Sequence, residues 1–249
     1  MKKRIPKTIE PCPIRDSIVE IQFNTTIIHP EVIFGKVMDA FSNIFPGENI
    51  KSLPILELPK QLIEKRPELK FKPHYQFKDD TFVMQIGPQV FSIGVPNHYV
   101  GWTAFYKKIE ECFSKFIELK IVESIKRLGI RYISFYEQNF IGIDNFDIFK
   151  HIDLEYSLPD IERTKKEMHI RTLLVNGQYS SNLRVLNNVA MNDQVGSIID
   201  IDTSCTNSIN VDLRGLLDAI NNGHDEEKYI IFNLLKQEFI DKLNPKYED

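Results

Sequence analysis

The chain has 249 residues, of which 42% are hydrophobic, 27% are charged and 11% are aromatic. This balance excludes disordered, collagen-like and coiled-coil proteins, and it provides enough apolar residues for a sizeable core. The formal net charge of -4 does not suit a protein that must neutralise many phosphates, so nucleic acid is not an expected partner. No apolar run approaches the roughly 18 residues of a membrane helix, so no membrane-spanning segment is expected.

Cysteine usage and the N-terminal residues predict a cytoplasmic protein. The three cysteines, Cys12, Cys112 and Cys205, are far apart in the sequence and form no CxxC pair. A disulfide framework or a structural zinc site would need more cysteines at closer spacing. Residues 1–7 are basic, but the apolar segment of a secretory signal peptide does not follow them.

The first half of the chain predicts a strand, a helix, three strands and a long helix. Apolar and polar residues alternate over residues 17–24, which is typical of a half-buried strand. A proline and an acid then open a helix over residues 30–45, whose apolar residues recur at helical spacing. Short alternating runs over residues 71–95 predict an antiparallel meander. A strongly amphipathic helix is expected over residues 102–116.

The second half predicts nearly the same order of elements. Its strongest local signal is Asn176-Gly177, which favours a type I′ hairpin turn between two strands. The predicted elements are a strand over 127–137, a short helix over 144–152, strands over 168–175, 178–189 and 197–205, a candidate strand over 209–213, and a last helix over 225–243.

These patterns predict an α+β fold made of two repeats of β-α-β-β-β-α, each with a mainly antiparallel sheet crossed by a long helix. The expected halves are residues 1–122 and 123–249, packed together as one unit. The halves share a pattern of elements but no residue-level identity. The order of elements is similar to helix-grip and TATA-binding-protein-like folds, a likeness that carries no function by itself.

Four short segments carry a family resemblance: residues 13–23 (PIRDSIVEIQF), 128–133 (LGIRYI) and 199–202 (IDID), and His224 ahead of the last helix. Together they resemble a sporadically distributed bacterial family of hypothetical proteins of unknown function and of about this length. The family's usual alanine after the glutamate of the first segment is absent here. The resemblance implies a bacterial protein from a mobile-element or defence locus, and it brings no catalytic residues.

Asp200 and Asp202 are the candidate metal ligands. They are two residues apart in a predicted strand, so both carboxylates project from the same face. Such a pair can bind Mg²⁺, with Asp193 or Asp212 completing the site. The alternative is an ordinary strand in which the neighbouring isoleucines face the core and both aspartates face water.

Two further motifs have weaker chemical interpretations. His224 lies in a Gly-His-Asp sequence that is typical of a helix start, where it can cap the helix or act as a catalytic base. No serine or cysteine nucleophile motif accompanies it. Pro159-Asp160 resembles the start of a PD-(D/E)xK nuclease motif, but the acid and lysine of residues 162–165 have the wrong spacing.

Aromatic residues concentrate in the predicted sheet and long helix of the first half. In a helix-grip fold, Trp102, Phe105 and Phe91 can line a cavity for an apolar ligand between the sheet and the helix. The same residues can equally form a filled core, because protein interiors are normally close-packed.

The leading hypothesis is a non-enzymatic protein-interaction module that acts on a protein partner or forms a homodimer, with an exposed edge strand as the docking element. The second hypothesis is a small apolar ligand binder with its site at Trp102, Phe105 and Phe91. The third is a metal-dependent hydrolase at Asp200 and Asp202. No cofactor is expected.

Overall fold

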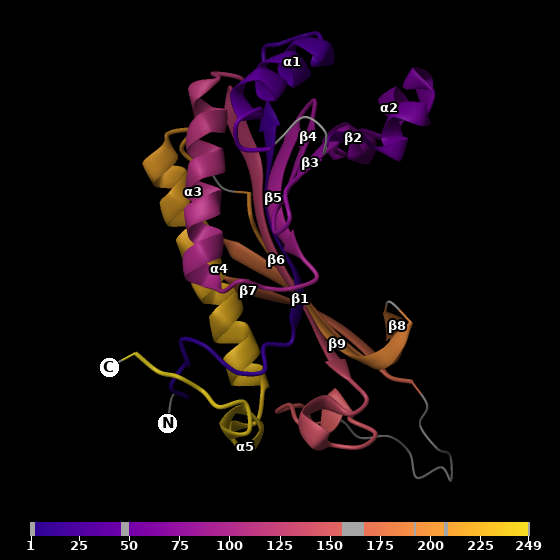
Figure 1. The fold of residues 1–249 in the computed structure, drawn as a ribbon, viewed down its shortest axis with the longest axis vertical. Helices are drawn as coiled ribbons and strands as arrows, with labels where there is room; N and C mark the ends of the chain where they lie inside the picture. Colours follow the sequence, from indigo (N-terminus) through magenta and orange to yellow (C-terminus); the bar gives the residue numbers. More distant parts are fainter. Residues whose placement is uncertain (1–2, 46–49, 156–166, 192, 207–208, 249) are drawn as a thin grey trace. The chain divides into compact units, whose positions relative to one another are not determined.

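The structure is a computed structural model that describes residues 3–45, 50–155, 167–191, 193–206 and 209–248 (Figure 1). Its strands are β1 (Ile14–Asn24), β2 (Ile50–Ser52), β3 (Tyr75–Lys78), β4 (Val83–Gly87), β5 (Val90–Pro96), β6 (Ser124–Glu137), β7 (His169–Asn176), β8 (Tyr179–Met191) and β9 (Gln194–Cys205). Its helices are α1 (Pro30–Phe41), α2 (Lys60–Lys65), α3 (Trp102–Glu118), α4 (Leu213–Leu234) and α5 (Gln237–Asp241), with 3-10 turns η2 (Pro54–Glu57), η3 (Pro67–Phe71), η4 (Phe140–Gly142) and η5 (Ile148–Lys150).

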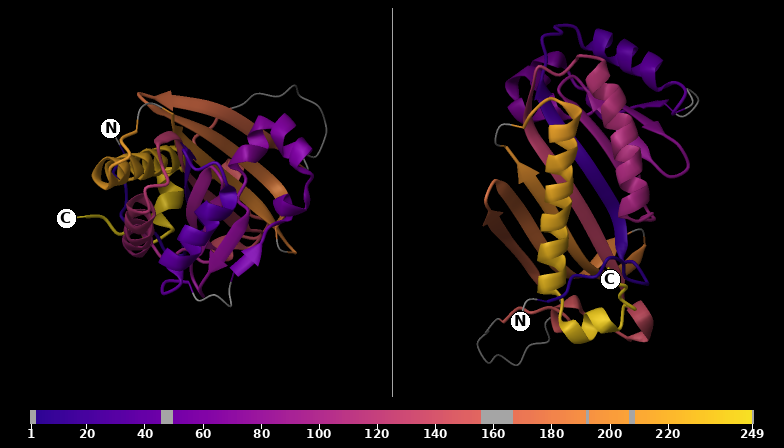
Figure 2. Two further views of the ribbon diagram at one scale, coloured as in Figure 1. Left: turned by 90° about the horizontal axis from the view of Figure 1, so that it is seen from above. Right: turned by 90° about the vertical axis from the view of Figure 1, so that its left-hand side faces the viewer.

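The fold is α+β, as predicted, but the described strands form one nine-stranded antiparallel sheet and not one sheet in each half. The strand order is β2-β3-β4-β5-β1-β6-β9-β8-β7, and the long helix α4 packs against the sheet. The order places β7 at one edge (Figure 2). Among the described helices, none is long and apolar enough to cross a membrane.

The described elements do not show the predicted repeat of β-α-β-β-β-α. The helix expected over 144–152 is the single 3-10 turn η5, because Asn145 has a left-handed φ of 50° and Asp147 caps the turn by accepting from the Phe149 amide. Of the candidate strand over 209–213, only Ile209 pairs, in one isolated antiparallel bridge with Ile125, and α4 begins at Leu213. Asp212 caps that start, its carboxylate accepting from the Gly215 amide at 2.8 Å.

The chain divides into two compact units, each assembled from separate segments. Unit 1 contains Met1–Arg15, Arg131–Thr203 and His224–Asp249, and unit 2 contains Asp16–Ile130 and Ser204–Gly223.

Unit 2 owes its core to the alternation of β1. Val19, Ile21 and Phe23 are fully buried on one face of that strand. The same face of β5 presents Phe91, whose ring stacks on Phe116 of α3 with the ring centroids 4.0 Å apart. α3 therefore lies along this face of the sheet, where its apolar stripe is buried.

Unit 1 has a separate aromatic core. Tyr136 of β6 stacks on Phe146, and both rings approach Phe239 of α5 within about 6 Å. Ile199 and Ile201 of β9 are buried on the face of the sheet that belongs to this core. The other face of β6 to β9 in unit 1 carries the polar side chains that are described next.

Candidate functional site

Asp200 lies at the centre of a charged network on the polar face of unit 1. Its two carboxylate oxygens each accept from the Arg131 guanidinium, at 2.8 Å. The Arg184 guanidinium, from the neighbouring strand β8, also donates to Asp200 Oδ2. The Asp200 side chain is only 5% exposed, whereas the two arginines are 35% and 42% exposed. The carboxylate is thus desolvated and paired with two cations, a different environment from the water-facing aspartate of the strand interpretation.

The other predicted metal ligands do not gather around Asp200. Asp202 lies two residues along the same strand, half-buried, while Asp212 caps α4 in unit 2. Asp193 occupies a turn with a φ of 63°. Among the described residues, no group of three or more His, Cys, Asp or Glu side chains is placed to hold a metal ion. The nuclease-like residues 159–165 lie outside the described residues.

His224 lies within α4 and not at its start. Its Nδ1 is 3.0 Å from the Tyr132 hydroxyl, and only 6% of the residue is exposed. Burial, followed by the charge of Lys228, lowers the pKa of His224 to about 3, so the imidazole is neutral at pH 7. His224 is thus a nearly buried, neutral side chain that contacts Tyr132.

One helical turn further along, Glu227 is buried against β9. Its Oε1 accepts from the Thr203 amide at 3.1 Å, while Oε2 has no hydrogen-bond partner among the described residues. Burial raises the pKa of Glu227 well above its ordinary value. No local pattern distinguishes this buried acid, because Glu226 and Glu227 are adjacent in a charged segment.

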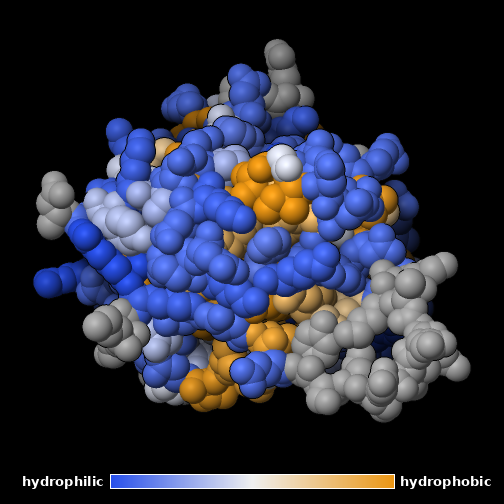
Figure 3. Space-filling view, turned by 90° about the horizontal axis from the view of Figure 1, so that it is seen from below, coloured by the Kyte–Doolittle hydropathy of each residue, from blue (hydrophilic) through white to orange (hydrophobic). Residues whose placement is uncertain are grey.

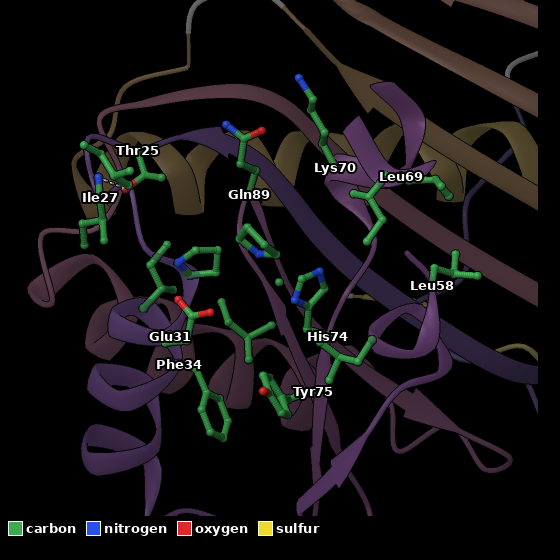
Figure 4. A pocket seen from close by; sticks show the side chains of 18 residues that line it. Thr25, Ile27, Glu31, Phe34, Leu58, Leu69, Lys70, His74, Tyr75 and Gln89 are labelled. Carbon is green, nitrogen blue, oxygen red and sulfur yellow. Dashed lines mark hydrogen bonds between the residues drawn. The ribbon is translucent and has the colours of Figure 1, made fainter. Parts of the chain in front are cut away.

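The three residues of the predicted aromatic ligand site pack against other aromatic side chains. Phe91 and Phe105 are fully buried, and Phe91 contacts Phe113 and Phe116. Trp102 is half-buried and packs at 6.2 Å from Phe105, ring centroid to ring centroid. None of the three predicted residues lines the pocket of unit 2 that Figure 4 shows.

The edge strand β7 has the features that docking requires. It pairs with β8 in an antiparallel hairpin, with Asn176 opposite Tyr179 across a two-residue loop. The hairpin prediction is therefore confirmed, although the loop is Gly177-Gln178, one residue later than predicted. Gly177 has a positive φ of 57°, whereas Gln178 is not among the described residues with a positive φ. A type I′ turn needs both, so the predicted turn type is wrong.

The register fixes which backbone groups of β7 face outward. A two-residue loop closes on a hydrogen-bonded pair, and such pairs alternate along the ladder. The Asn187 amide donates to the Met168 carbonyl at 3.2 Å, as expected if the hydrogen-bonded pairs begin at Asn176 and Tyr179 and recur at every second residue. The even-numbered residues of β7 therefore bond to β8. The amide and carbonyl groups that point away from β8 belong to His169, Arg171, Leu173 and Val175.

The side chains of β7 are unusually exposed for a strand. Leu173 is 65% exposed and Val175 is 70% exposed, and they share one face of the hairpin with Arg171. On the molecular face in Figure 3, apolar areas are broken up by polar ones. Along β7, three apolar side chains, at residues 173–175, follow one another directly. Exposed apolar strands of this kind are interaction or aggregation sites.

Arg171 adds a charge to this edge. Its Nε donates to Asn182 Oδ1 at 2.9 Å, and it forms no ion pair within the part of the chain that the structure describes. It lies directly opposite Arg184, so the two strands nearest the edge present two arginines on this face. The amino-acid pattern predicts a docking edge strand but does not identify which strand it is. The run Leu-Leu-Val ahead of Asn-Gly was the available signal.

Comparison with known proteins adds no function to this description. No protein-family model matches the chain, and no curated protein matches it either.

Proposed function

We propose that the protein is a non-enzymatic interaction module that docks an extended segment of a partner protein as an additional strand beside β7. The observation that supports this proposal best is the outward-facing backbone of Arg171, Leu173 and Val175. An added strand would satisfy these amide and carbonyl groups and would cover the exposed apolar side chains beside them. Main-chain hydrogen bonds supply affinity in such strand addition, and side-chain contacts supply specificity.

The charges at the edge favour a particular partner chemistry. On the face that carries Leu173 and Val175, the charged side chains of β7 and β8 are Arg171 and Arg184. Arg184 is paired with Asp200, which leaves Arg171 as the cation nearest the docking edge. A segment that alternates apolar and acidic residues would cover the apolar side chains and pair with Arg171. A second copy of β7 would instead bring further arginines to the same edge, so self-pairing is less favoured.

The other parts of the sequence interpretation belong to this proposal as well. They are a bacterial cytoplasmic setting, a mobile-element or defence locus, and a finer relationship to helix-grip or TATA-binding-protein-like folds. The predicted alternatives at Trp102 and at Asp202 receive less support, because the aromatic residues are packed and Asp200 is engaged by two arginines.

The proposal is tested with a fluorescent synthetic peptide of alternating valine and glutamate, and with a matched peptide of valine and lysine. We expect the full chain to bind the acidic peptide at least about tenfold more tightly, as measured by fluorescence anisotropy. Leu173→Pro removes an outward amide without removing a bond to β8, and proline is tolerated at such edge positions. This variant should lose binding, whereas Leu173→Ala keeps the amide and should lose only part of it.

The urea midpoint of each variant, measured in parallel, establishes that the strand remains folded. Equal binding by Leu173→Pro and the parent chain would contradict docking at β7, and so would tighter binding of the lysine peptide. Sedimentation of the chain alone distinguishes the other occupant. A stable dimer that Leu173→Pro dissociates would show that a second copy occupies the edge, against the partner proposed here.

A further inference from the structure

Unit 2 contains a pocket that the proposed docking function does not use. It has a volume of about 580 Å³, within the range of small-molecule sites. The start of α1 forms one wall, β3 and the turn between β4 and β5 form another, and η2, α2 and η3 contribute apolar side chains (Figure 4). The apolar lining includes Ile33, Phe34, Leu56, Leu58, Leu69 and Ile86.

The walls of this pocket are fixed by local contacts. The rings of Phe34 and Tyr75 stack with their centroids 3.8 Å apart, which joins α1 to β3. The His74 amide donates to the Ile86 carbonyl at 2.8 Å, and the His74 carbonyl accepts from the Leu53 amide at 2.8 Å. The backbone that carries His74 is thus held on both sides, which fixes the point from which its imidazole projects.

Two polar side chains line the apolar space, one from the exposed residue Glu31 and one from the half-buried residue His74. Figure 4 shows Glu31 on the α1 side and His74 on the β3 side, while the Lys70 side chain extends away from both. Within the described residues, the His74 imidazole has no hydrogen-bond partner and Glu31 forms no ion pair. Burial lowers the pKa of His74, so its ring is neutral at pH 7 and offers a nitrogen acceptor on the wall that faces Glu31.

We infer that this pocket binds a small apolar amine. An ammonium group would donate to the Glu31 carboxylate and to the neutral His74 ring, while the hydrocarbon part of the ligand would contact the leucines of η2 and η3. Leu56 and Leu58 are 41% and 37% exposed, and such a ligand would cover them. A carboxylate ligand would be repelled by Glu31, and an alcohol would lack the charge that Glu31 complements.

The test compares hexylamine, hexanol and hexanoate, three probes with the same chain length and different head groups. Binding to the full chain is followed by two-dimensional amide NMR. We expect saturable shifts at His74, Ile86 and Gln89, with hexylamine bound about tenfold more tightly than hexanol and hexanoate bound most weakly. Glu31→Gln should reduce the affinity for hexylamine to the level of hexanol. Asp39→Asn, which changes an acid of the same helix outside the pocket, should leave it unchanged.

Three results would each overturn the inference. They are the absence of saturable shifts at the pocket amides, equal affinity for the three probes, and an affinity for hexylamine that Glu31→Gln does not alter. Leu173→Pro is predicted to have no effect on amine binding, so this experiment is independent of docking at β7.

Discussion

Arg171 of β7 lies directly opposite Arg184 of β8 in the antiparallel ladder. Like charges at facing positions repel each other, which makes this pair unfavourable for the isolated hairpin. Asp200 relieves Arg184 by an ion pair, but Arg171 receives only the neutral Asn182 amide oxygen. An acidic residue on a docked strand would complete the neutralisation of this edge.

Replacing Arg171 therefore separates stability from binding. We predict that Arg171→Gln raises the free energy of unfolding by about 0.5 kcal/mol, because the like-charged pair is removed. The same variant should bind the acidic valine–glutamate peptide at least about fivefold more weakly, since the charge nearest the edge is lost. Urea denaturation and fluorescence anisotropy measure the two effects. Undiminished peptide affinity would show that Arg171 does not contact the docked strand.

Asp200 is predicted to stabilise the fold and not to hold a metal. Asp200→Asn leaves Arg131 and Arg184 with a neutral partner in place of the buried carboxylate. We expect the free energy of unfolding to fall by about 2 kcal/mol. The loss is no larger because both arginines are partly exposed, so water screens their charges. Urea denaturation measures the loss. Asp193→Asn, at a turn position that asparagine tolerates, is the control and should change stability little. A loss of Mg²⁺ binding in calorimetry with unchanged stability would reverse this interpretation.

The burial of Glu227 leads us to predict that the stability of Glu227→Gln relative to the parent chain depends on pH. Its pKa is raised by burial in the folded chain, so its contribution to stability is complete below the ordinary pKa of 4.5 and is lost as the pH rises toward the folded value. Glu227→Gln resembles the protonated acid at every pH. Its stability relative to the parent chain should rise above about pH 4.5, to a gain of about 1 kcal/mol near pH 8.

Thermal or urea unfolding of both chains between about pH 4 and pH 8 measures this difference. Asp225→Asn, an exposed acid of the same helix, is the control and should show no such trend. A flat difference for Glu227→Gln would mean that the carboxyl is ionised in the folded chain.

The burial of His224 leads us to predict the opposite pH dependence, a loss of stability as the pH falls. Burial lowers its pKa to about 3 from an ordinary 6.5, so the stability that the neutral ring contributes is present above pH 6.5 and is lost as the pH falls toward the folded value. The parent chain should lose roughly 2 kcal/mol relative to His224→Gln between about pH 6.5 and pH 4.5. His98→Gln, which replaces an exposed histidine, should remove none of this loss. The same pH profile in parent and His224→Gln chains would contradict burial of a neutral imidazole.

Local patterns were sufficient to predict most of the elements. The alternation of β1 and the apolar stripe of α3 follow directly from which side chains are buried. The start of α4 was predicted too late, because Gly223-His224-Asp225 resembles a helix start, whereas the helix begins after the Asp212 cap. The single sheet was also missed, because it depends on pairing between strands that are distant in the sequence.

The candidate sites were harder to predict because they too combine residues that are distant in the sequence. Asp200 was singled out, but its partner Arg131 lies 69 residues away in the chain, so the ion pair left no local signal. The pocket beside α1 is likewise assembled from separate segments around Glu31 and His74. Exposure of β7 depends on its place at the end of the strand order, which no spacing within its own sequence encodes.

Amide hydrogen exchange along β7, read residue by residue by NMR, tests the docking proposal most directly. In the free chain, the outward amides of Arg171, Leu173 and Val175 should exchange faster than the amides of Thr172 and Leu174, which bond to β8. Saturation with the valine–glutamate peptide should slow the outward amides at least about tenfold and leave the inward ones nearly unchanged. Outward amides that still exchange fast in the saturated complex would contradict strand addition at β7.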